Sequence, residues 1–113
     1  MSGRLTSQML VSALIRRAQA AGGFATVLHK GESMSGAIVV QVVESARHTG
    51  FFERIMGLDG RSHLVSTGPK LVSDFSDISQ YIDRRLRADP DIWFVELDVA
   101  EGEQLAADIL CAG

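Results

Sequence analysis

The run of residues 37–44 constrains the fold more than any other part of the chain. Five of its eight residues are β-branched, namely Ile38, Val39, Val40, Val42 and Val43. Such side chains favour an extended strand because a helix restricts their rotation about χ1. Neighbouring side chains of a strand point to opposite faces, so both faces of this strand are apolar apart from Gln41. The pattern therefore predicts a central strand covered on both sides, or a strand whose second face meets a partner chain.

Four further strands and three helices are predicted around this segment. β-Branched and aromatic residues indicate strands at 24–30, 51–56, 63–66 and 92–99. An Asp59-Gly60 turn precedes the strand at 63–66, and residues 45–50 are interpreted as a loop. Apolar residues at helical spacing predict helices at 6–21, about 73–88 and about 101–111.

The ends of two helices carry their own signals. Thr6 or Ser7 can cap the first helix, because a side-chain oxygen accepts a hydrogen bond from a free backbone N–H. Asp98 followed by Glu101 matches a capping box at the start of the last helix.

These elements predict an α+β fold in the order α-β-β-β-β-α-β-α. Three consecutive strands with short connections favour an antiparallel meander, so the sheet of about five strands is expected to be antiparallel or mixed. We expect the three helices to pack mainly on one face of it. The chain has 113 residues without a repeat or a long linker, which predicts a single domain over residues 1–113.

Composition and charge narrow the classes of function. Hydrophobic residues make up 46% and charged residues 22% of the chain, as in ordinary globular domains. The formal net charge of −3 argues against nucleic acid as the main partner, because phosphate binding draws on a basic surplus. Cys111 is the single cysteine, and no secretory or membrane-spanning segment is recognisable. We therefore expect a cytoplasmic protein with no membrane association and no cofactor.

Four carboxylates near the last strand form one candidate site. Asp89 and Asp91 flank Pro90, and Glu96 and Asp98 lie two apart, so that they share one face of a strand. Such carboxylates can hold a divalent metal or divide acid and base roles, as in a small metal-dependent hydrolase. Alternatively, the two aspartates form turns around the proline, Asp98 caps a helix and Glu96 faces solvent. We favour this second interpretation because no histidine or lysine motif accompanies the group.

Arginines near two helix ends form a second candidate group. They are Arg16 and Arg17 in the first helix and Arg84, Arg85 and Arg87 in the second. If the two helices pack side by side, the five guanidinium groups would form an anion-binding or RNA-binding patch. Cations near a helix C-terminus also stabilise the helix dipole, which explains both groups without a ligand. We treat anion binding as the weaker interpretation.

The other reactive side chains give little support for catalysis. His29 and His63 would approach each other only if their strands are near neighbours. Cys111 lies at the end of a helix, where the dipole disfavours the reactive thiolate. No catalytic residue is assigned, and the sequence leaves open whether the chain is an enzyme while favouring that it is not.

Three segments together resemble a known family. They are the run 20–28 with Lys30-Gly31, the run 89–98, and the preceding 11–17. The pattern resembles a family of short bacterial proteins, mostly proteobacterial and about 110 residues long, which is catalogued as a domain of unknown function. The resemblance covers nearly the whole chain and is least distinctive at 45–50 and 62–73. It implies a complete bacterial domain and carries no activity with it.

Two classes of function remain, with a third as a weaker alternative. The first is a non-catalytic binding or assembly module that forms a homodimer, supported by the two-sided apolar strand at 37–44. The second is a metal-dependent hydrolase using the carboxylates between Asp89 and Asp98. The third is RNA or anion binding by the arginines. The sequence does not identify a ligand or another protein partner.

Overall fold

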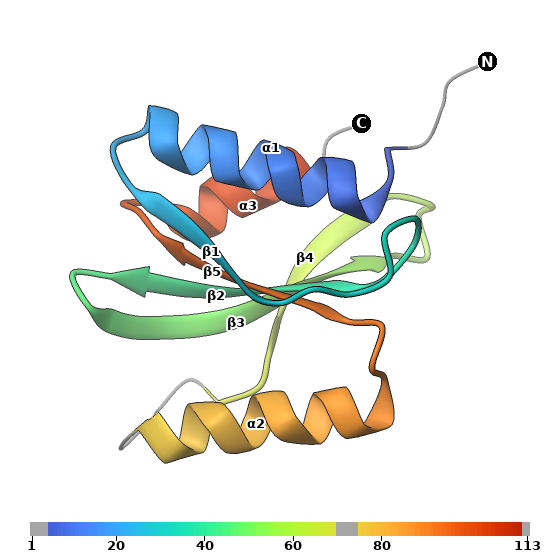
Figure 1. Ribbon diagram of the computed structural model, residues 1–113. Helices are drawn as coiled ribbons and strands as arrows, with labels where there is room; N and C mark the ends of the chain where they lie inside the picture. The colour runs from blue at the N-terminus through green and yellow to red at the C-terminus, as the bar shows by residue number, and fades with distance from the viewer. Residues whose placement is uncertain (1–4, 70–74, 112–113) are drawn as a thin grey trace.

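A computed structural model describes residues 5–69 and 75–111 (Figure 1). Its elements are α1 (Ser7–Ala20), β1 (Phe24–His29), β2 (Ile38–Glu44), β3 (Arg47–Met56), β4 (Ser62–Thr67), α2 (Phe75–Ala88), β5 (Trp93–Asp98) and α3 (Gly102–Leu110). The predicted α+β class and element order are confirmed. The predicted start of the second helix near Ser73 lies outside the described residues.

The strands form one mixed sheet in the order β1-β5-β2-β3-β4. β2, β3 and β4 are the expected antiparallel meander. β5 inserts between β1 and β2, antiparallel to the first and parallel to the second. This insertion places β2 at the centre of the sheet, which accounts for its apolar residues on both faces.

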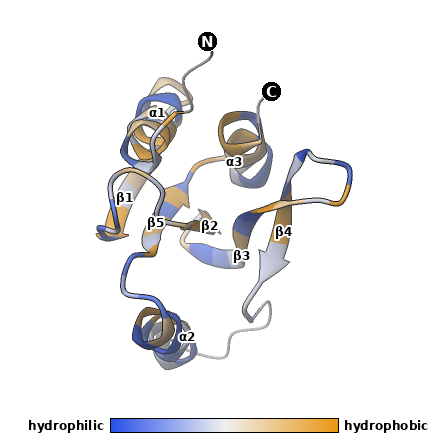
Figure 2. Ribbon diagram, turned by 90° about the vertical axis from the view of Figure 1, so that its right-hand side faces the viewer, coloured by the Kyte–Doolittle hydropathy of each residue, from blue (hydrophilic) through white to orange (hydrophobic). Residues whose placement is uncertain are grey.

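Helices cover both faces of the sheet rather than mainly one (Figures 1 and 2). α1 and α3 cover one face, where Leu14 packs in a core with Val40 and Leu97. α2 covers the other face, where Tyr81 packs in a second core with Phe94. The expectation that the helices lie mainly on one face is therefore corrected for α2. Apolar residues alternate onto both faces of β2 and β5, so each face needs a cover.

Gln41, the polar exception in β2, is satisfied inside this second face. It is 5% exposed, and its Nε2 lies 3.1 Å from His48 Nδ1. An amide nitrogen only donates, so Nδ1 is the acceptor and His48 carries its proton on Nε2. That Nε2–H donates to the Pro69 carbonyl at 3.1 Å. The bonds therefore connect β2 and β3 to the segment that leads into α2.

The helix starts confirm one predicted cap and correct the other. Thr6 caps α1, because its Oγ1 accepts a hydrogen bond from Met9 N at 3.1 Å. The capping box expected for the last helix is wrong, since Asp98 ends β5 and Glu101 is the N-cap of α3 without a side-chain cap bond. Glu101 has a φ of 55°, in the left-handed region.

No helix of the described residues has the length and apolar character needed to cross a membrane.

The hairpin between β2 and β3 is tighter than predicted. β3 begins at Arg47, so the loop expected over 45–50 is reduced to Ser45 and Ala46. Their φ angles are 52° and 62°, as a two-residue hairpin turn requires at both central positions. Glycine and asparagine usually signal such a turn, and neither is present here. The two turn residues therefore carry no sequence signal that predicts this hairpin.

Glu32 fixes the connection between β1 and β2. Its carboxylate accepts hydrogen bonds from Met34 N at 2.6 Å and Ser35 N at 3.0 Å. Its carbonyl oxygen accepts a hydrogen bond from Trp93 Nε1 at 2.8 Å. The backbone donors of Met34 and Ser35 favour the charged carboxylate and lower the pKa of Glu32.

Replacing Ala46 by glycine should stabilise the protein. A left-handed alanine is less stable than a left-handed glycine by about 1 kcal/mol, so Ala46→Gly should raise the free energy of unfolding by about that amount in urea denaturation. The control Ala13→Gly lies inside α1 and should lower it by about 1 kcal/mol. A loss of stability in Ala46→Gly would contradict the turn conformation.

The contribution of Glu32 should depend on pH. Its folded-state pKa is lowered, so the stabilisation is present above the unfolded-state pKa of about 4.3 and is lost as the pH falls through the folded-state value. Glu32→Gln should therefore be less stable than the native chain near neutral pH, and the difference should shrink below pH about 4. Thermal unfolding at several pH values measures it, and a difference independent of pH would refute the carboxylate's role.

Candidate functional site

The four predicted carboxylates do not converge on one site. Asp89 and Asp91 precede β5, whereas Asp98 is its last residue. At about 3.3 Å per residue, the two ends of the group lie roughly 20 Å apart. Asp89 Oδ1 accepts a hydrogen bond from Asp91 N at 3.0 Å, which is the turn role. Among residues 5–69 and 75–111, no three His, Cys, Asp or Glu side chains are arranged to hold a metal ion.

The arginines do not form the single patch that side-by-side helices would give. Arg16 and Arg17 are exposed on α1, whereas Arg84, Arg85 and Arg87 belong to α2 on the opposite face of the sheet (Figure 1). The condition for a five-arginine surface is therefore not met. Anion binding by either smaller group stays a prediction.

Arg85 is held by a structural network that the sequence did not reveal. Its Nη2 lies 2.9 Å from Glu53 Oε1 on β3, and its Nη1 donates to Tyr81 Oη at 2.7 Å. Burial alone would lower the pKa of Arg85, but the hydrogen bonds to Glu53 and Tyr81 outweigh it and raise the pKa. The arginine therefore connects α2 to the sheet, and two of its guanidinium nitrogens are engaged in structural hydrogen bonds.

Hydrogen bonds, an ion pair and burial account for His29, His63 and Cys111 without a ligand. His29 lies on β1 and His63 on β4, at opposite edges of the sheet, so they do not share a site. His29 Nδ1 donates to the Ile92 carbonyl at 2.9 Å, and His63 pairs with Asp59 at 3.0 Å. Burial raises the pKa of the Cys111 thiol, with Arg54 opposing, so the reactive thiolate is disfavoured.

The outer edge of β1 is the first exposed surface of note. β1 ends the sheet on one side, and Figure 2 shows no other element beyond it. Phe24 is 69% exposed, and Val27 and Leu28 are 37% and 42% exposed. No residue from Phe24 to Leu28 is charged. Natural edge strands usually carry charges, proline or a β-bulge that hinders pairing with another chain. β1 has no charge or proline from Phe24 to Leu28, and its register with β5 shifts only near its end, between Val27 and His29.

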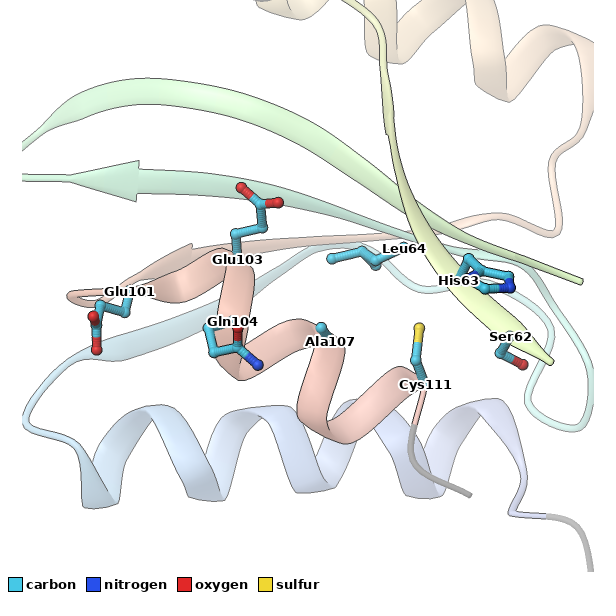
Figure 3. Close-up of a pocket in the computed structure, with 8 residues that line it drawn as sticks. All are labelled: Ser62, His63, Leu64, Glu101, Glu103, Gln104, Ala107 and Cys111. Carbon is cyan, nitrogen blue, oxygen red and sulfur yellow. The ribbon is translucent and has the colours of Figure 1, made fainter. Parts of the chain in front are cut away.

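A groove between α3 and β4 is the second surface (Figure 3). It has a volume of about 540 Å³ and is lined by Ser62, His63, Leu64, Glu101, Glu103, Gln104, Ala107 and Cys111. Leu64 extends from β4 towards α3, and the Cys111 sulfur points towards β4. The two glutamates lie at the opposite end of α3 from Cys111. Sequence analysis missed this groove because its lining comes from segments about 40 residues apart.

Removing Arg85 should destabilise the fold. Arg85→Ala leaves Glu53 without its charged partner in a largely buried position, so the free energy of unfolding should fall by about 2 kcal/mol. Arg84→Ala changes an exposed neighbour and should alter it by less than about 0.5 kcal/mol. Urea denaturation of both variants measures the two changes in the free energy of unfolding. Equal changes would show that the contacts of Arg85 add no stability.

Comparisons with known proteins agree with this fold. The family model described as "Protein of unknown function (DUF1491)" matches residues 5–107. A crystal structure of a DUF1491 family protein from Caulobacter crescentus is 35% identical, with a TM-score of 0.76, and the match covers 90% of this chain and 94% of that one. No curated protein matched the chain.

Two solution structures give the same result. Protein Atu0922 from A. tumefaciens is 31% identical with a TM-score of 0.74, and the match covers 91% of this chain and 92% of that one. An NMR structure of a DUF1491 family protein from Caulobacter crescentus is 34% identical with a TM-score of 0.74, covering 91% and 94%. The resemblance to a proteobacterial family of unknown function is thus confirmed. The chain therefore belongs to the DUF1491 family.

Proposed function

We propose that this protein is a non-catalytic assembly module of the cytoplasm that forms a homodimer through the outer edge of β1. The observation that carries the proposal is an edge strand whose exposed residues are apolar and uncharged. Its backbone N–H and C=O groups on the outer side can pair with a further strand. A cytoplasmic location is consistent with a single, half-buried cysteine whose thiol has a raised pKa.

The support for a dimer moves from β2 to β1. The sequence suggested that the second apolar face of residues 37–44 meets a partner. In the structure α1 and α3 cover one face of β2 and α2 covers the other. β2 is therefore interior. Of the two edge strands, β1 and β4, it is β1 that has large apolar side chains exposed.

A second copy of this chain fits the β1 edge. Antiparallel self-pairing about a two-fold axis brings no like charges opposite each other, because β1 is uncharged from Phe24 to Leu28. A register centred on Thr26 would bring Phe24 close to the end of the second copy's β1, where Leu28 lies at the register shift between Val27 and His29. Both side chains are exposed in the single chain, so this pairing would remove apolar surface from water.

A lysine in the middle of β1 should prevent dimer formation. Thr26 is exposed and lies beside Glu96 of β5, so Thr26→Lys is compatible with the fold of one chain. It would place two lysines opposite each other across the two-fold axis. Sedimentation equilibrium at micromolar concentration should give twice 12.2 kDa for the native chain and 12.2 kDa for the variant.

Ser66→Lys is the matched control. Ser66 is exposed on β4, the strand at the opposite edge of the sheet. This variant should remain a dimer with unchanged unfolding. Thr26→Lys should stay folded as a monomer and lose only the stability that the dimer contacts contribute. A native chain that is a monomer would overturn the proposal. A dimer that survives Thr26→Lys, or that Ser66→Lys disrupts, would place the interface elsewhere than on β1.

A further inference from the structure

The β1 edge by itself is too small to hold two chains together. β1 has six residues, Phe24–His29. A stable interface buries about 800 Å² on each partner and uses about 20–30 residues of each. A homodimer that pairs two β1 strands therefore needs further contacts from elements that lie beside β1.

α1 is the helix that lies next to the β1 edge. It packs over β1 and the adjacent β5, whereas α3 packs over β2 and β4 (Figure 2). The backbone N–H of Gly23 donates to the Ala18 carbonyl at 2.8 Å, so the end of α1 lies directly beside the start of β1. The side of α1 that faces away from α3 therefore faces the outer side of the β1 edge.

Helical geometry identifies the residues on that side of α1. Leu10, Leu14 and Ala18 are buried against the sheet. Arg17 lines a cavity together with Leu105 of α3, so it marks the side of α1 that faces α3. At about 3.6 residues per turn, the side opposite Arg17 carries four uncharged residues. These four residues are Gln8, Ser12, Ile15 and Gln19.

Pairing of two β1 strands would bring two α1 helices side by side. Antiparallel strands are related by a two-fold axis perpendicular to the sheet, so both copies carry α1 on the same face. Strands lie about 4.8 Å apart, so a helix above the boundary between β1 and β5 is about 5 Å from that axis. The two helix axes would then be about 10 Å apart, within the usual packing distance of about 8–10 Å.

The four residues fit antiparallel packing of α1 against a second α1. Gln8 and Gln19 are equally far from the point midway between residues 13 and 14. Ser12 and Ile15 are also equally far from that point. A two-fold axis there places each residue opposite the other member of its pair in the second copy. The contact then has facing amides at both ends and small or aliphatic side chains in the middle.

The two-fold axis through Thr26 of β1 passes near the same point of α1. Gly23 lies beside Ala18, and α1 and β1 run in opposite directions (Figure 1). From Gly23 to Thr26 the strand advances about 10 Å, which corresponds to about six or seven residues back along α1. Thr26 therefore lies within one helical turn of the midpoint of α1, and a single axis can satisfy both contacts.

We propose that the two α1 helices pack antiparallel against each other in the homodimer, through Gln8, Ser12, Ile15 and Gln19. This contact rests on the homodimer proposed above, because pairing of β1 brings the two helices together. Each chain then contributes a strand and a helix to one continuous interface. The surface that α1 recognises is the same uncharged helix side of the second copy.

Charged pairs at the two glutamines test the helix packing. Gln8→Glu with Gln19→Lys places opposite charges across both ends of the contact, so the dissociation constant of the dimer should fall about threefold to fivefold. Gln8→Glu with Gln19→Glu places like charges there and should raise it by about the same factor. Sedimentation equilibrium over a concentration series measures both constants, and added salt should reduce the difference between them.

A second like-charged variant separates the helix contact from net charge. Gln8→Lys with Gln19→Lys makes the chain less negative than its formal charge of −3, whereas the two glutamates make it more negative. Facing like charges predict that both variants weaken the dimer. If the variant with two lysines strengthens the dimer, net charge explains the effects and the proposed packing of α1 is wrong.

The Thr26→Lys background tests whether the charges act between chains. Within one α1, residues 8 and 19 are about 16 Å apart, too far for a direct ion pair. In this monomeric background the two substitutions should therefore change the urea midpoint independently of each other. Coupling between them in the monomer would show an effect within one chain and would refute the contact between helices.

The outcomes distinguish this proposal from the β1 dimer. If Thr26→Lys disrupts the native dimer but the charge pairs leave the dissociation constant unchanged, α1 does not contact its second copy and the β1 pairing stands alone. If the native chain is a monomer, both proposals are overturned.

Discussion

The parallel pairing of β5 with β2 is the interaction on which the rest of the structure depends. It aligns Val40 with Val95 and Val42 with Leu97, and all four side chains are buried. Because β5 occupies the place beside β2, β1 is displaced to an edge although it precedes β2 in the chain. Two adjacent strands with apolar residues on both faces also require cover on both sides, which α1 and α3 provide on one face and α2 on the other.

Polar side chains attach the outer segments to this central pair. Glu32 holds the connection between β1 and β2 and meets the indole of Trp93 through its carbonyl. Gln41 and His48 hold the segment before α2, and Arg85 joins α2 itself to Glu53. Buried polar groups need such partners, because an unmet hydrogen bond in the interior is destabilising. Some charged residues that look like ligand-binding groups in the sequence therefore have a structural role.

The two exposed surfaces follow from the same arrangement. Insertion of β5 leaves β1 with an unpaired outer side, and α3 leaves a groove against β4 at the other end of the sheet. The surfaces differ in chemistry as well as in position. The β1 edge is uncharged from Phe24 to Leu28 and offers backbone groups and apolar side chains, whereas the groove is lined by both polar and apolar side chains.

The sequence by itself determined which segments are helices and strands, because periodicity and β-branching act over neighbouring residues. It also indicated that β2 is a central strand with apolar residues on both faces. Only the tertiary structure decided that β5 lies beside β2, that α2 crosses the second face and that Ser45 and Ala46 form a turn without glycine. The partners of charged residues were also undetermined, since Arg85 and Glu53 are 32 residues apart. The edge of β1 and the α3 groove arise from strand order and packing, which depend on contacts between distant residues and leave no local pattern.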